Sequence, residues 1–445
     1  MQRILSALMV LAALPASLAA GRDVQQPNFV IIFADDLGYG DPGCYGNPTI
    51  RTPHLDRMAV EGMRFTQFYS AASVCTPSRA ALLTGRLPVR SGMCSDRRRV
   101  LFPNSLNGLP ASEITLAAAL KERGYSTACV GKWHLGHLPE YLPTRRGFDT
   151  YFGIPYSNDM KPTPLMRDEQ VIEEPADQST LTKRYTEQAV RFIREHKEDP
   201  FFLYLPHTFP HVPLFASAAF KGTSPRGLYG DVVEELDASV GQVLETLREL
   251  DLAERTFVFF TSDNGPWLVK HLQGGTAGLL REGKGSTWEG GMRVPAIAWW
   301  PTRVPAGTVS LALAGTMDLF TTCLTLAGAS IPTDRVIDGV DLSSVLLGTG
   351  PSPRETFFYY RGTQLMAIRK GPWKAHFYTQ GAYGPAARER IAHDPPLLFH
   401  LEHDPSEQYD VAADNPEVIA DILRERDRHQ ADLEPAPSQL EARRQ

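Results

Sequence analysis

The chain has 445 residues, of which 42% are hydrophobic and 22% are charged, a balance typical of a soluble globular protein with a sizeable core. Its length predicts roughly two or three domains. A formal net charge of −6 disfavours a nucleic-acid-binding protein, which would be basic, but it leaves room for an anionic small substrate in a local cationic pocket.

The N-terminus has the pattern of a signal peptide, which we assign to residues 1–20. Arg3 supplies the positive charge, residues 4–14 form a short apolar stretch, and residues 17–20 form the cleavage region. A transmembrane anchor is the alternative, but the apolar stretch is short for a span and no later stretch is long enough. We therefore expect an exported protein, periplasmic or secreted, with no membrane span after cleavage.

The first predicted strand, residues 28–34, is continuously apolar, as expected for a strand covered on both faces of a sheet. It ends at Asp35 and Asp36. Two adjacent acids at this place can form a helix cap or a turn, or they can coordinate a hard cation.

The chain next places a reactive side chain at the start of a predicted helix. Thr76 is a good N-cap, Pro77 suits the first helical position, and Gly85 suits the helix stop. Cys75 would then lie at the positive end of the helix, where an anion is favoured, and Arg79 could reach the same anion. A lone cysteine before a helix is more often a small buried hydrophobe, and the full pattern Cys-x-Pro-x-Arg is what argues against that interpretation.

Cysteine usage is consistent with a special role for Cys75. The chain has five cysteines, and an odd number leaves at least one thiol unpaired in an exported protein. Cys44 and Cys94 are interpreted as packing or disulfide residues, and the pairing among the other cysteines is left open.

Three further apolar runs resemble the first and also end in polar or ionisable residues. They cover residues 125–130, 201–205 and 256–261. The side chains that follow them are Lys132 and His134, then His207 and His211, then Asp263 and Asn264. Ligands of open α/β sheets bind beyond the carboxyl ends of the strands, so we expect these loops to line one site. His207 is interpreted as a structural neighbour of His211.

Two loops carry cations whose role the sequence leaves open. Lys284 lies between two glycines in the loop 274–291; a solvated lysine is the usual case, but the glycines allow the backbone to approach an anion closely. Arg97, Arg98 and Arg99 are usually a solvated loop, with a grip on an anionic glycan as the alternative.

Helical spacing fills the intervals between the strands, at residues 115–123, 180–195 and 231–250. This alternation predicts a three-layer α/β domain with a large, mostly parallel sheet at residues 21–345. Further strands are expected at 356–360, 365–369 and 373–378, with a final helix at 415–430. They predict a smaller C-terminal α+β domain at 346–435, followed by a frayed tail at 436–445.

Five segments together resemble the type I sulfatase family, and its arylsulfatases in particular. They are residues 34–38, 75–85, 131–136, 262–265 and 283–285. The resemblance covers nearly the whole chain after the signal peptide, and the C-terminal segments 374–377 and 393–398 agree with it. It implies an alkaline-phosphatase-like fold, one calcium ion, and oxidation of Cys75 to formylglycine (3-oxoalanine) by a maturation enzyme.

The resemblance implies a metal site made of oxygen ligands, which calcium prefers. The ligands would be Asp35, Asp36, Asp263, Asn264 and an oxygen of the modified Cys75. Asn264 stands where two-metal phosphatase relatives carry a histidine, and without imidazole at this position zinc is less favoured.

The implied nucleophile is one hydroxyl of the gem-diol that forms when the Cys75 aldehyde is hydrated. Activated by the metal and close to Arg79, this hydroxyl attacks sulfur and expels the alcohol. His134 then takes the proton of the second hydroxyl, so that the sulfated diol collapses to the aldehyde and free sulfate. A serine or a thiol lacks the second hydroxyl, which is why the modification belongs to the implied mechanism.

The resemblance also assigns residues to the sulfate and the leaving group. Lys132 would bind a sulfate oxygen, and Ser157 would add a hydroxyl donor. His211 and Lys284 would lie near the bridging oxygen, bind sulfate and help protonate the alcohol. His393 is interpreted as a pocket-lining residue from the smaller domain.

The sequence thus predicts a sulfuric ester hydrolase that converts an aryl sulfate, or a sulfated galactoside or glycan, to the alcohol and inorganic sulfate. A formylglycine-dependent phosphodiesterase or phosphonate hydrolase is one alternative, and relative rates on an aryl sulfate and a phosphate diester would discriminate it. A non-catalytic binder of sulfated glycans is the other, and the complete set of expected catalytic positions disfavours it. The oligomeric state is left open.

Overall fold

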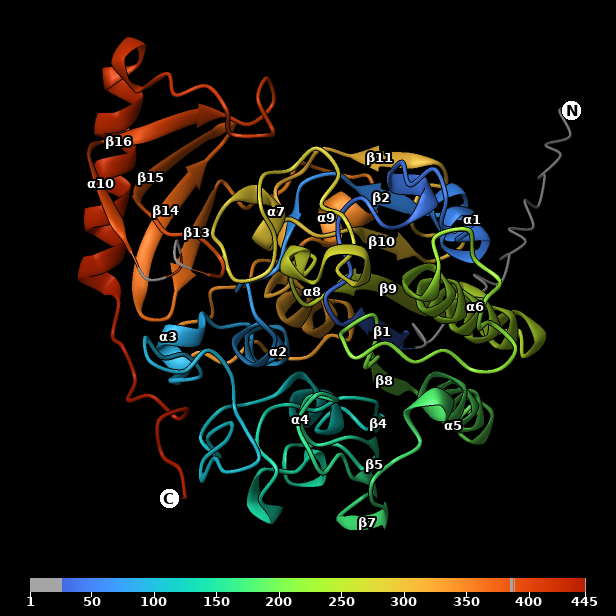
Figure 1. Ribbon diagram of the computed structural model, residues 1–445. Helices are drawn as coiled ribbons and strands as arrows, with labels where there is room; N and C mark the ends of the chain where they lie inside the picture. Colours follow the sequence, from blue (N-terminus) through green and yellow to red (C-terminus); the bar gives the residue numbers. More distant parts are fainter. Residues whose placement is uncertain (1–25, 385–386, 388, 445) are drawn as a thin grey trace, which may run out of the picture.

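The computed structural model describes residues 26–384, 387 and 389–444, so the predicted signal peptide at 1–20 lies outside the described residues. The largest feature is a mixed sheet (Figure 1) made of β1 (Asn28–Ala34), β2 (Met63–Phe65), β4 (Ser126–Val130), β5 (Thr150–Gly153), β6 (Leu165–Arg167), β7 (Gln170–Glu173), β8 (Phe201–Pro206), β9 (Thr256–Ser262), β10 (Ala296–Trp299) and β11 (Thr308–Ser310). Its ten strands have the order β11-β2-β10-β9-β1-β8-β4-β5-β6-β7.

The central strands β9-β1-β8-β4-β5 run parallel to one another. β1, β8 and β9 are buried along their whole length, which explains their continuous apolar sequences. Along β1, Phe29 and Ile31 enter one hydrophobic core, and Val30 and Ile32 enter another on the opposite face. The prediction of a large, mostly parallel sheet covered on both faces is confirmed.

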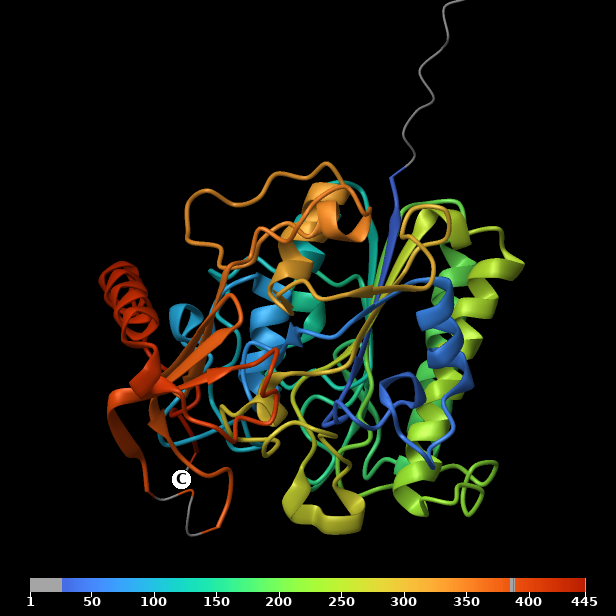
Figure 2. The ribbon, with the colours of Figure 1, turned by 90° about the horizontal axis from the view of Figure 1, so that it is seen from above.

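Helices cover both faces of the large sheet, which gives three layers (Figures 1 and 2). One face carries α1 (Pro53–Glu61), α5 (Leu181–Glu195) and α6 (Leu228–Glu249), and the other carries α2 (Cys75–Thr84), α4 (Leu116–Lys121) and α8 (Asp318–Leu326). The shorter helices are α3 (Pro88–Ser91), α7 (Glu289–Met292) and α9 (Ser343–Leu346), and β3 (Phe68–Tyr69) pairs with β12 (Ala314–Gly315) apart from the large sheet. The predicted alkaline-phosphatase-like three-layer architecture is therefore confirmed.

A second, four-stranded antiparallel sheet follows in the chain, beside the face of the large sheet that carries α2 (Figure 2). It consists of β13 (Thr356–Arg361), β14 (Gln364–Lys370), β15 (Trp373–Thr379) and β16 (Ile391–His400), and α10 (Pro416–Asp432) packs on it. The sequence did not predict β16, because Pro395 and Pro396 interrupt it; β16 pairs only with β15, and an edge strand tolerates proline.

A buried group of charged side chains, the interface cluster, joins the C-terminal sheet to α7. Its members are Glu289, Arg293, Arg369, Lys374 and Glu407. Lys374 Nζ lies 3.0 Å from Glu289 Oε1 and 2.9 Å from Glu407 Oε1. Burial acts to raise the pKa of Glu289, but the charges of Lys374, Arg293 and Arg369 outweigh it and lower that pKa to about 2. Because Glu289 directly follows the loop that carries Lys284, the interface cluster ties this loop to the C-terminal sheet.

The start of α2 differs from the prediction. The helix begins at Cys75, and the N-cap is Val74, which makes no side-chain capping bond. The hydroxyl of Thr76 instead donates to His134 O (3.0 Å) and accepts from Leu101 N (3.2 Å), so tertiary contacts replace the expected cap. The helix stop is confirmed, because Gly85 has a φ of 68°.

The prediction of a frayed tail at 436–445 is wrong for residues 436–444. Ala436 N donates to Val89 O (2.9 Å), Gln439 N to Gly92 O (2.8 Å), and Leu106 N to Ala442 O (2.9 Å). Leu440 is fully buried in the core under the α2 face. One buried leucine and several backbone hydrogen bonds therefore anchor a segment whose composition suggested disorder.

Two further predictions from the sequence concern disulfide pairing of the cysteines and membrane-spanning segments. The five cysteines remain free thiols, so Cys44 and Cys94 act as packing residues in this structure. Among the helices of the described residues, none combines the length and apolar character that a membrane crossing requires.

Candidate active site

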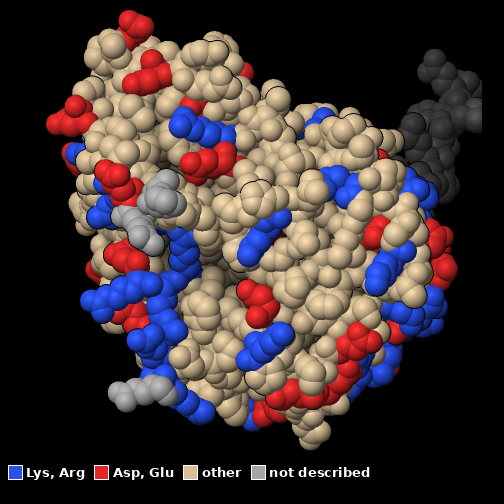
Figure 3. Space-filling view, in the orientation of Figure 1, with Lys and Arg blue, Asp and Glu red and all other residues tan. Residues whose placement is uncertain are grey.

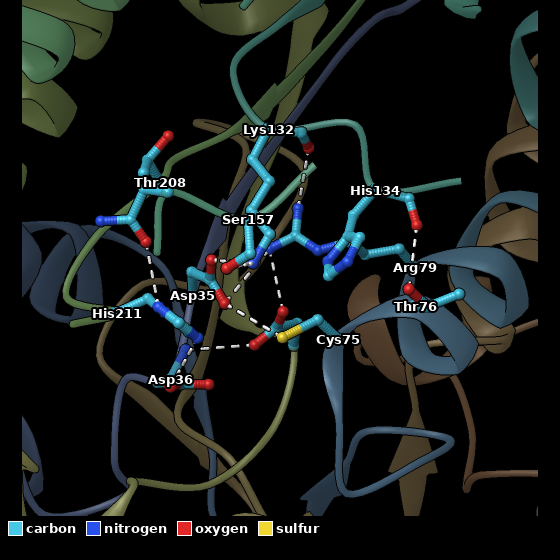
Figure 4. Close-up of polar contacts among 12 residues, drawn as sticks. Asp35, Asp36, Cys75, Thr76, Arg79, Lys132, His134, Ser157, Thr208 and His211 are labelled. Atoms are coloured by element: carbon cyan, nitrogen blue, oxygen red, sulfur yellow. Dashed lines mark hydrogen bonds and ion pairs between the residues drawn. The ribbon is translucent and has the colours of Figure 1, made fainter. Parts of the chain in front are cut away.

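The polar residues that follow the central strands meet at the carboxyl edge of the large sheet, beside the N-terminus of α2 (Figure 4). This active-site cluster consists of Asp35, Asp36, Cys75, Arg79, Lys132, His134, Ser157, His211, Asp263, Asn264 and Lys284. Each of them is at most 5% exposed. The structure thus brings together the residues that the strand ends and the glycine-rich loop predicted.

Cys75, the first residue of α2, is buried among charged groups. Its Sγ lies 3.5 Å from Asp35 Oδ1 and 3.5 Å from Lys284 Nζ. Burial raises the pKa of the thiol well above its usual range, and the charges of Lys132 and Lys284 lower it too little to compensate. The unmodified side chain is therefore a protonated thiol and a poor nucleophile at neutral pH.

Three carboxylates and three cations are paired inside the active-site cluster. The pairs are Lys132 with Asp35 (2.5 Å), Arg79 with Asp263 (2.9 Å) and Lys284 with Asp36 (2.6 Å). Burial acts to raise the pKa of Asp35, but the charges of Lys132, His211 and Arg79 hold it well below its usual range. Since the formal charges of the three pairs balance, an added divalent cation would leave excess positive charge, which favours binding of an anionic ester.

The cluster brings together side chains that could hold a metal ion. Potential ligand atoms within 4.8 Å of one another belong to Asp35, Asp36, Cys75 and His211. Asn264 Oδ1 is also buried there and has no hydrogen-bond partner among the described residues. The predominance of oxygen donors fits calcium. Asp263 already accepts hydrogen bonds from Asp36 N (3.1 Å) and Arg79.

His134 presents a free ring nitrogen to the cluster. Its Nε2 lies 2.9 Å from Leu101 O, an acceptor, which places the proton on Nε2. Nδ1 is buried and has no partner in the described part of the chain. Burial and the charge of Lys132 lower the pKa of His134 well below its usual value. His134 is therefore a neutral imidazole with an available lone pair.

His211 has the opposite tautomer, which Asn158 helps to fix. His211 Nδ1 lies 3.0 Å from Asn158 Oδ1 and 2.6 Å from Val212 O, so Nδ1 carries the proton and Nε2 faces Asp36 at 3.7 Å. The sequence analysis did not identify Asn158, although it directly follows Ser157. Its amide donates to Gln178 and Pro213, which identifies Oδ1 as the acceptor for His211.

The sequence analysis also did not identify an aromatic pair, Trp267 and Tyr383, that lies next to His211. The ring centroid of Trp267 lies 5.3 Å from that of His211 and 5.6 Å from that of Tyr383. Lys284 Nζ lies 4.5 Å from the Trp267 centroid. Both aromatic residues come from irregular loops, where no periodicity marks them.

Two predicted histidines lie outside these contacts. His207 is fully buried and meets Ser239 Oγ at 3.3 Å; burial lowers its pKa to about 4, in keeping with a structural role. His393 lies on β16, where its Nε2 bonds to Thr379 Oγ1 at 2.8 Å. The structure does not bring His393 into the active-site cluster, and its pocket-lining role stays a prediction.

Two family descriptions and several known proteins match this chain over most of its length. The family described as Sulfatase matches residues 27–329, and the C-terminal region of aryl-sulfatase matches residues 352–445. Similar relatives are N-acetylgalactosamine-6-sulfatase of Canis lupus familiaris (44% identity, 97% of this chain, 91% of the relative) and arylsulfatase A of Homo sapiens (44%, 92% and 88%). The PsFucS1 sulfatase structure from Pseudoalteromonas sp. has a TM-score of 0.84 at 30% identity, covering 92% of this chain and 90% of that one.

The matched ranges cover both sheets, and the first of them contains the positions of the active-site cluster. They agree with the fold described above. The chain therefore belongs to the sulfatase family of sulfuric ester hydrolases.

Proposed function

We propose that this protein hydrolyses a sulfate ester to the alcohol and inorganic sulfate, with Cys75 converted to formylglycine and one calcium ion in the active-site cluster. The observation that carries the proposal is the setting of Cys75. As a thiol it is protonated and unreactive. Its Sγ nevertheless lies within 3.5 Å of Asp35, a potential metal ligand, and of Lys284, a potential anion-binding group.

Two groups would complete the site. Asp35, Asp36, Asp263 and Asn264 would hold calcium, which when bound supplies positive charge to the sulfate oxygens and the attacking oxygen. The formylglycine, once formed, supplies as its hydrate the nucleophilic oxygen and the second hydroxyl that permits release of sulfate.

Lys132 and Ser157 are arranged to bind one side of the sulfate group. Lys132 Nζ lies 3.3 Å from Ser157 Oγ, so both groups can donate hydrogen bonds to the same sulfate oxygen. Although burial opposes it, the charge of Asp35 raises the pKa of Lys132, which keeps the ammonium charged. Arg79, fully buried, holds Asp263 and the Lys132 carbonyl in place.

Lys284 and His211 are arranged to assist the leaving alcohol. Burial acts to lower the pKa of Lys284, but Asp36 raises it well above its usual value, so Lys284 is a charged donor. His211 Nε2 lies beside it, oriented through the Nδ1 contact with Asn158. His134, with its free Nδ1, is the base that accepts the proton of the second hydroxyl.

We further propose that the substrate is an aryl sulfate or a sulfated galactoside or glycan. The relatives named for N-acetylgalactosamine-6-sulfate and aryl sulfate support this range. Trp267 and Tyr383 offer aromatic faces beside Lys284 against which a sugar or aryl ring could pack.

The remaining assignments follow from the sequence. We propose a signal peptide at 1–20, export to the periplasm or the medium, and a maturation enzyme that acts on Cys75. The catalytic domain is assigned to 21–345 and the C-terminal domain to 346–435, with the ordered tail added to it.

The test measures sulfate release from an aryl sulfate and from galactose and N-acetylgalactosamine sulfated at single positions. The protein is produced with a maturation enzyme and supplied with calcium, and Cys75→Ala is the control. Release that the control lacks supports the proposal, and preference for one sugar position identifies the substrate. Fully modified protein that releases no sulfate would contradict it, and phosphate diesters would be assayed next.

A further inference from the structure

A hollow of about 390 Å³ opens beside the active-site cluster, next to the turn between β13 and β14. Its wall includes Val74 and Pro77, which lie on either side of Cys75 in the sequence, and Gly285, which follows Lys284. Gly285 N donates to Ser73 O (2.8 Å), so the strip of backbone that borders the hollow also carries two active-site residues. The volume falls in the range of small-ligand pockets, about 300–1,000 Å³.

Basic side chains dominate the charged lining of this hollow. The charged residues in its wall are Arg97, Arg99, Arg361, Arg390 and Asp96. Asp96 is already engaged, because its carboxylate accepts from Thr363 N (2.9 Å) and Thr363 Oγ1 (2.7 Å). Figure 3 shows a column of Lys and Arg side chains beside a hollow on this side of the molecule. The chain as a whole has a net charge of −6, so this local excess of arginine is not a consequence of composition.

Arg99 is fixed in this wall, and no described acidic side chain pairs with it. Its guanidinium lies 4.9 Å from the ring centroid of Tyr383, and its Nη2 donates to Ala382 O at 2.8 Å. Its Nη1 is buried but has no hydrogen-bond partner among the described residues. The neighbouring Arg97, in contrast, pairs with Glu441 at 3.8 Å.

Arg361, at the end of β13, is fixed against the same loop. Its Nη1 donates to Gly285 O and Gly381 O, both at 2.9 Å, and within the described residues its hydrogen bonds all come from Nη1. The two guanidinium groups meet at Gly285: Arg361 Nη1 donates to its carbonyl, and a Cβ built on Gly285 would lie 2.5 Å from Arg99 Nη1. In keeping with this proximity, burial and the positive charge of Arg99 lower the pKa of Arg361 to about 10. An anion between the two guanidinium groups would remove their repulsion and satisfy the remaining donors.

We propose that Arg99 and Arg361 form a second anion subsite, which binds a sulfate or carboxylate on the sugar next to the one that carries the scissile sulfate ester. Arginine offers pairs of parallel N–H donors that match the oxygens of such groups. The inference rests on the proposed sulfatase activity and deepens it, because it identifies the substrate class as oligosaccharides with at least two anionic groups. Ordinary solvated arginines would not leave a buried Nη1 unbonded.

The test uses three disaccharides that carry the same scissile sulfate. The neighbouring sugar is neutral in the first, a uronate in the second, and sulfated in the third. Sulfate release is measured with the formylglycine-bearing wild type and with R99Q, R361Q and R98Q. R98Q is the matched control, because the Arg98 guanidinium lies over Phe102 (4.9 Å) and donates to Asn104 (3.1 Å), and Arg98 is not part of the wall.

We expect the wild type to have a KM roughly 10- to 100-fold lower for an anionic neighbour than for a neutral one. R99Q and R361Q remove most of this difference by raising KM more than they lower kcat, and R98Q retains it. The larger preference, for the uronate or for the second sulfate, identifies the group that the subsite binds.

Equal wild-type KM values on the three disaccharides would overturn the subsite, as would an effect of R98Q as large as that of R99Q. If R99Q or R361Q fails to fold, the wild-type preference among the three substrates still decides. The absence of sulfate release from every substrate, an aryl sulfate included, would instead contradict the proposed function.

Discussion

The active-site cluster and the interface cluster are both buried groups of acids and cations, but they differ in how completely their polar atoms are bonded. In the interface cluster, every carboxylate oxygen of Glu289 and Glu407 has a hydrogen-bond donor, although Nδ1 of the adjacent His376 is buried without a partner among the described residues. In the active-site cluster, Asn264 Oδ1, His134 Nδ1 and Arg79 Nε have no partner among the described residues. Each buried unsatisfied polar atom costs about 1–3 kcal/mol.

This difference in hydrogen bonding distinguishes a cluster that stabilises the fold from one that can bind a ligand. A saturated cluster stabilises one arrangement of two sheets and has no capacity left for a ligand. An unsaturated cluster is held in place by the surrounding fold and, under the proposed function, would gain its missing bonds from substrate and metal. Arg99 resembles the unsaturated cluster in this respect, because its buried Nη1 has no partner among the described residues, whereas the Arg97 side chain is exposed to solvent.

The largest expected effect is that of Cys75→Ala. Sulfate release should fall by roughly 10⁴-fold or more, because the variant lacks the side chain that the proposed function converts to the nucleophile. The free energy of unfolding should change by only about 1 kcal/mol, since a single buried sulfur atom is removed. Aryl sulfate hydrolysis and urea unfolding measure the two quantities.

Cys323→Ala is the matched control for this variant. Cys323 is also fully buried, but it lies in α8, away from the active-site cluster. Its replacement should leave activity within about twofold of the wild type. Comparable losses in both variants would mean that the effect of Cys75→Ala is structural.

The two buried lysines test the comparison directly. Lys374→Met leaves Glu289 and Glu407 without their shared cation, so the free energy of unfolding should fall by about 3–5 kcal/mol while kcat of the folded enzyme changes little. Lys132→Met should lower kcat/KM roughly 100-fold or more and destabilise less in calcium, because the ion compensates Asp35. The reverse pattern would refute the division into a structural and a functional cluster.

Calcium removal should affect only the unsaturated cluster. Relative to protein in calcium at 100 times its Kd, a chelator should lower the free energy of unfolding by about 2.7 kcal/mol. Lys374→Met should retain this difference and Asp36→Asn should lose most of it. Urea unfolding with and without calcium measures the effect, and an Asp36→Asn protein with the full calcium dependence would place the ion elsewhere.

The smallest expected effect is a pH dependence at His376, whose Nε2 bonds to Glu407 at 2.7 Å in the interface cluster. Burial and the charge of Lys374 lower the pKa of His376 in the folded state. The unfolded state therefore binds a proton first as pH falls below about 6.5, and stability decreases from that point. His376→Gln should reduce this decrease between pH 7 and pH 5, whereas an unchanged slope would assign it to other groups.

Much of the fold was predictable because its central strands are buried on both faces. The apolar runs that became β1, β4, β8 and β9 lie close to their predicted bounds. The polar residues that follow them converge on one site, as expected for the carboxyl ends of strands in an open α/β sheet. The missed elements break a local rule: β16 contains two consecutive prolines, and the tail owes its order to the burial of Leu440.

The site was predictable in its residue types and not in its details. Asn158, Trp267 and Tyr383 lie in irregular segments without a periodic or motif signal. The hydroxyl of Thr76 bonds to residues about 25 and 58 positions away, at Leu101 and His134, instead of capping its own helix. No local propensity reports such a contact.

The sequence by itself determined which residues are candidates for the chemistry, because hydrophobic periodicity, strand ends and the Cys-x-Pro-x-Arg segment are local properties of the chain. Only the tertiary structure decided which polar atoms are saturated. Arg99, Gly285 and Arg361 come from three distant segments, and their proximity depends on how the C-terminal sheet packs against the large one. Saturation is a property of that packing, and it distinguishes the buried charges that stabilise the fold from those that can bind a ligand.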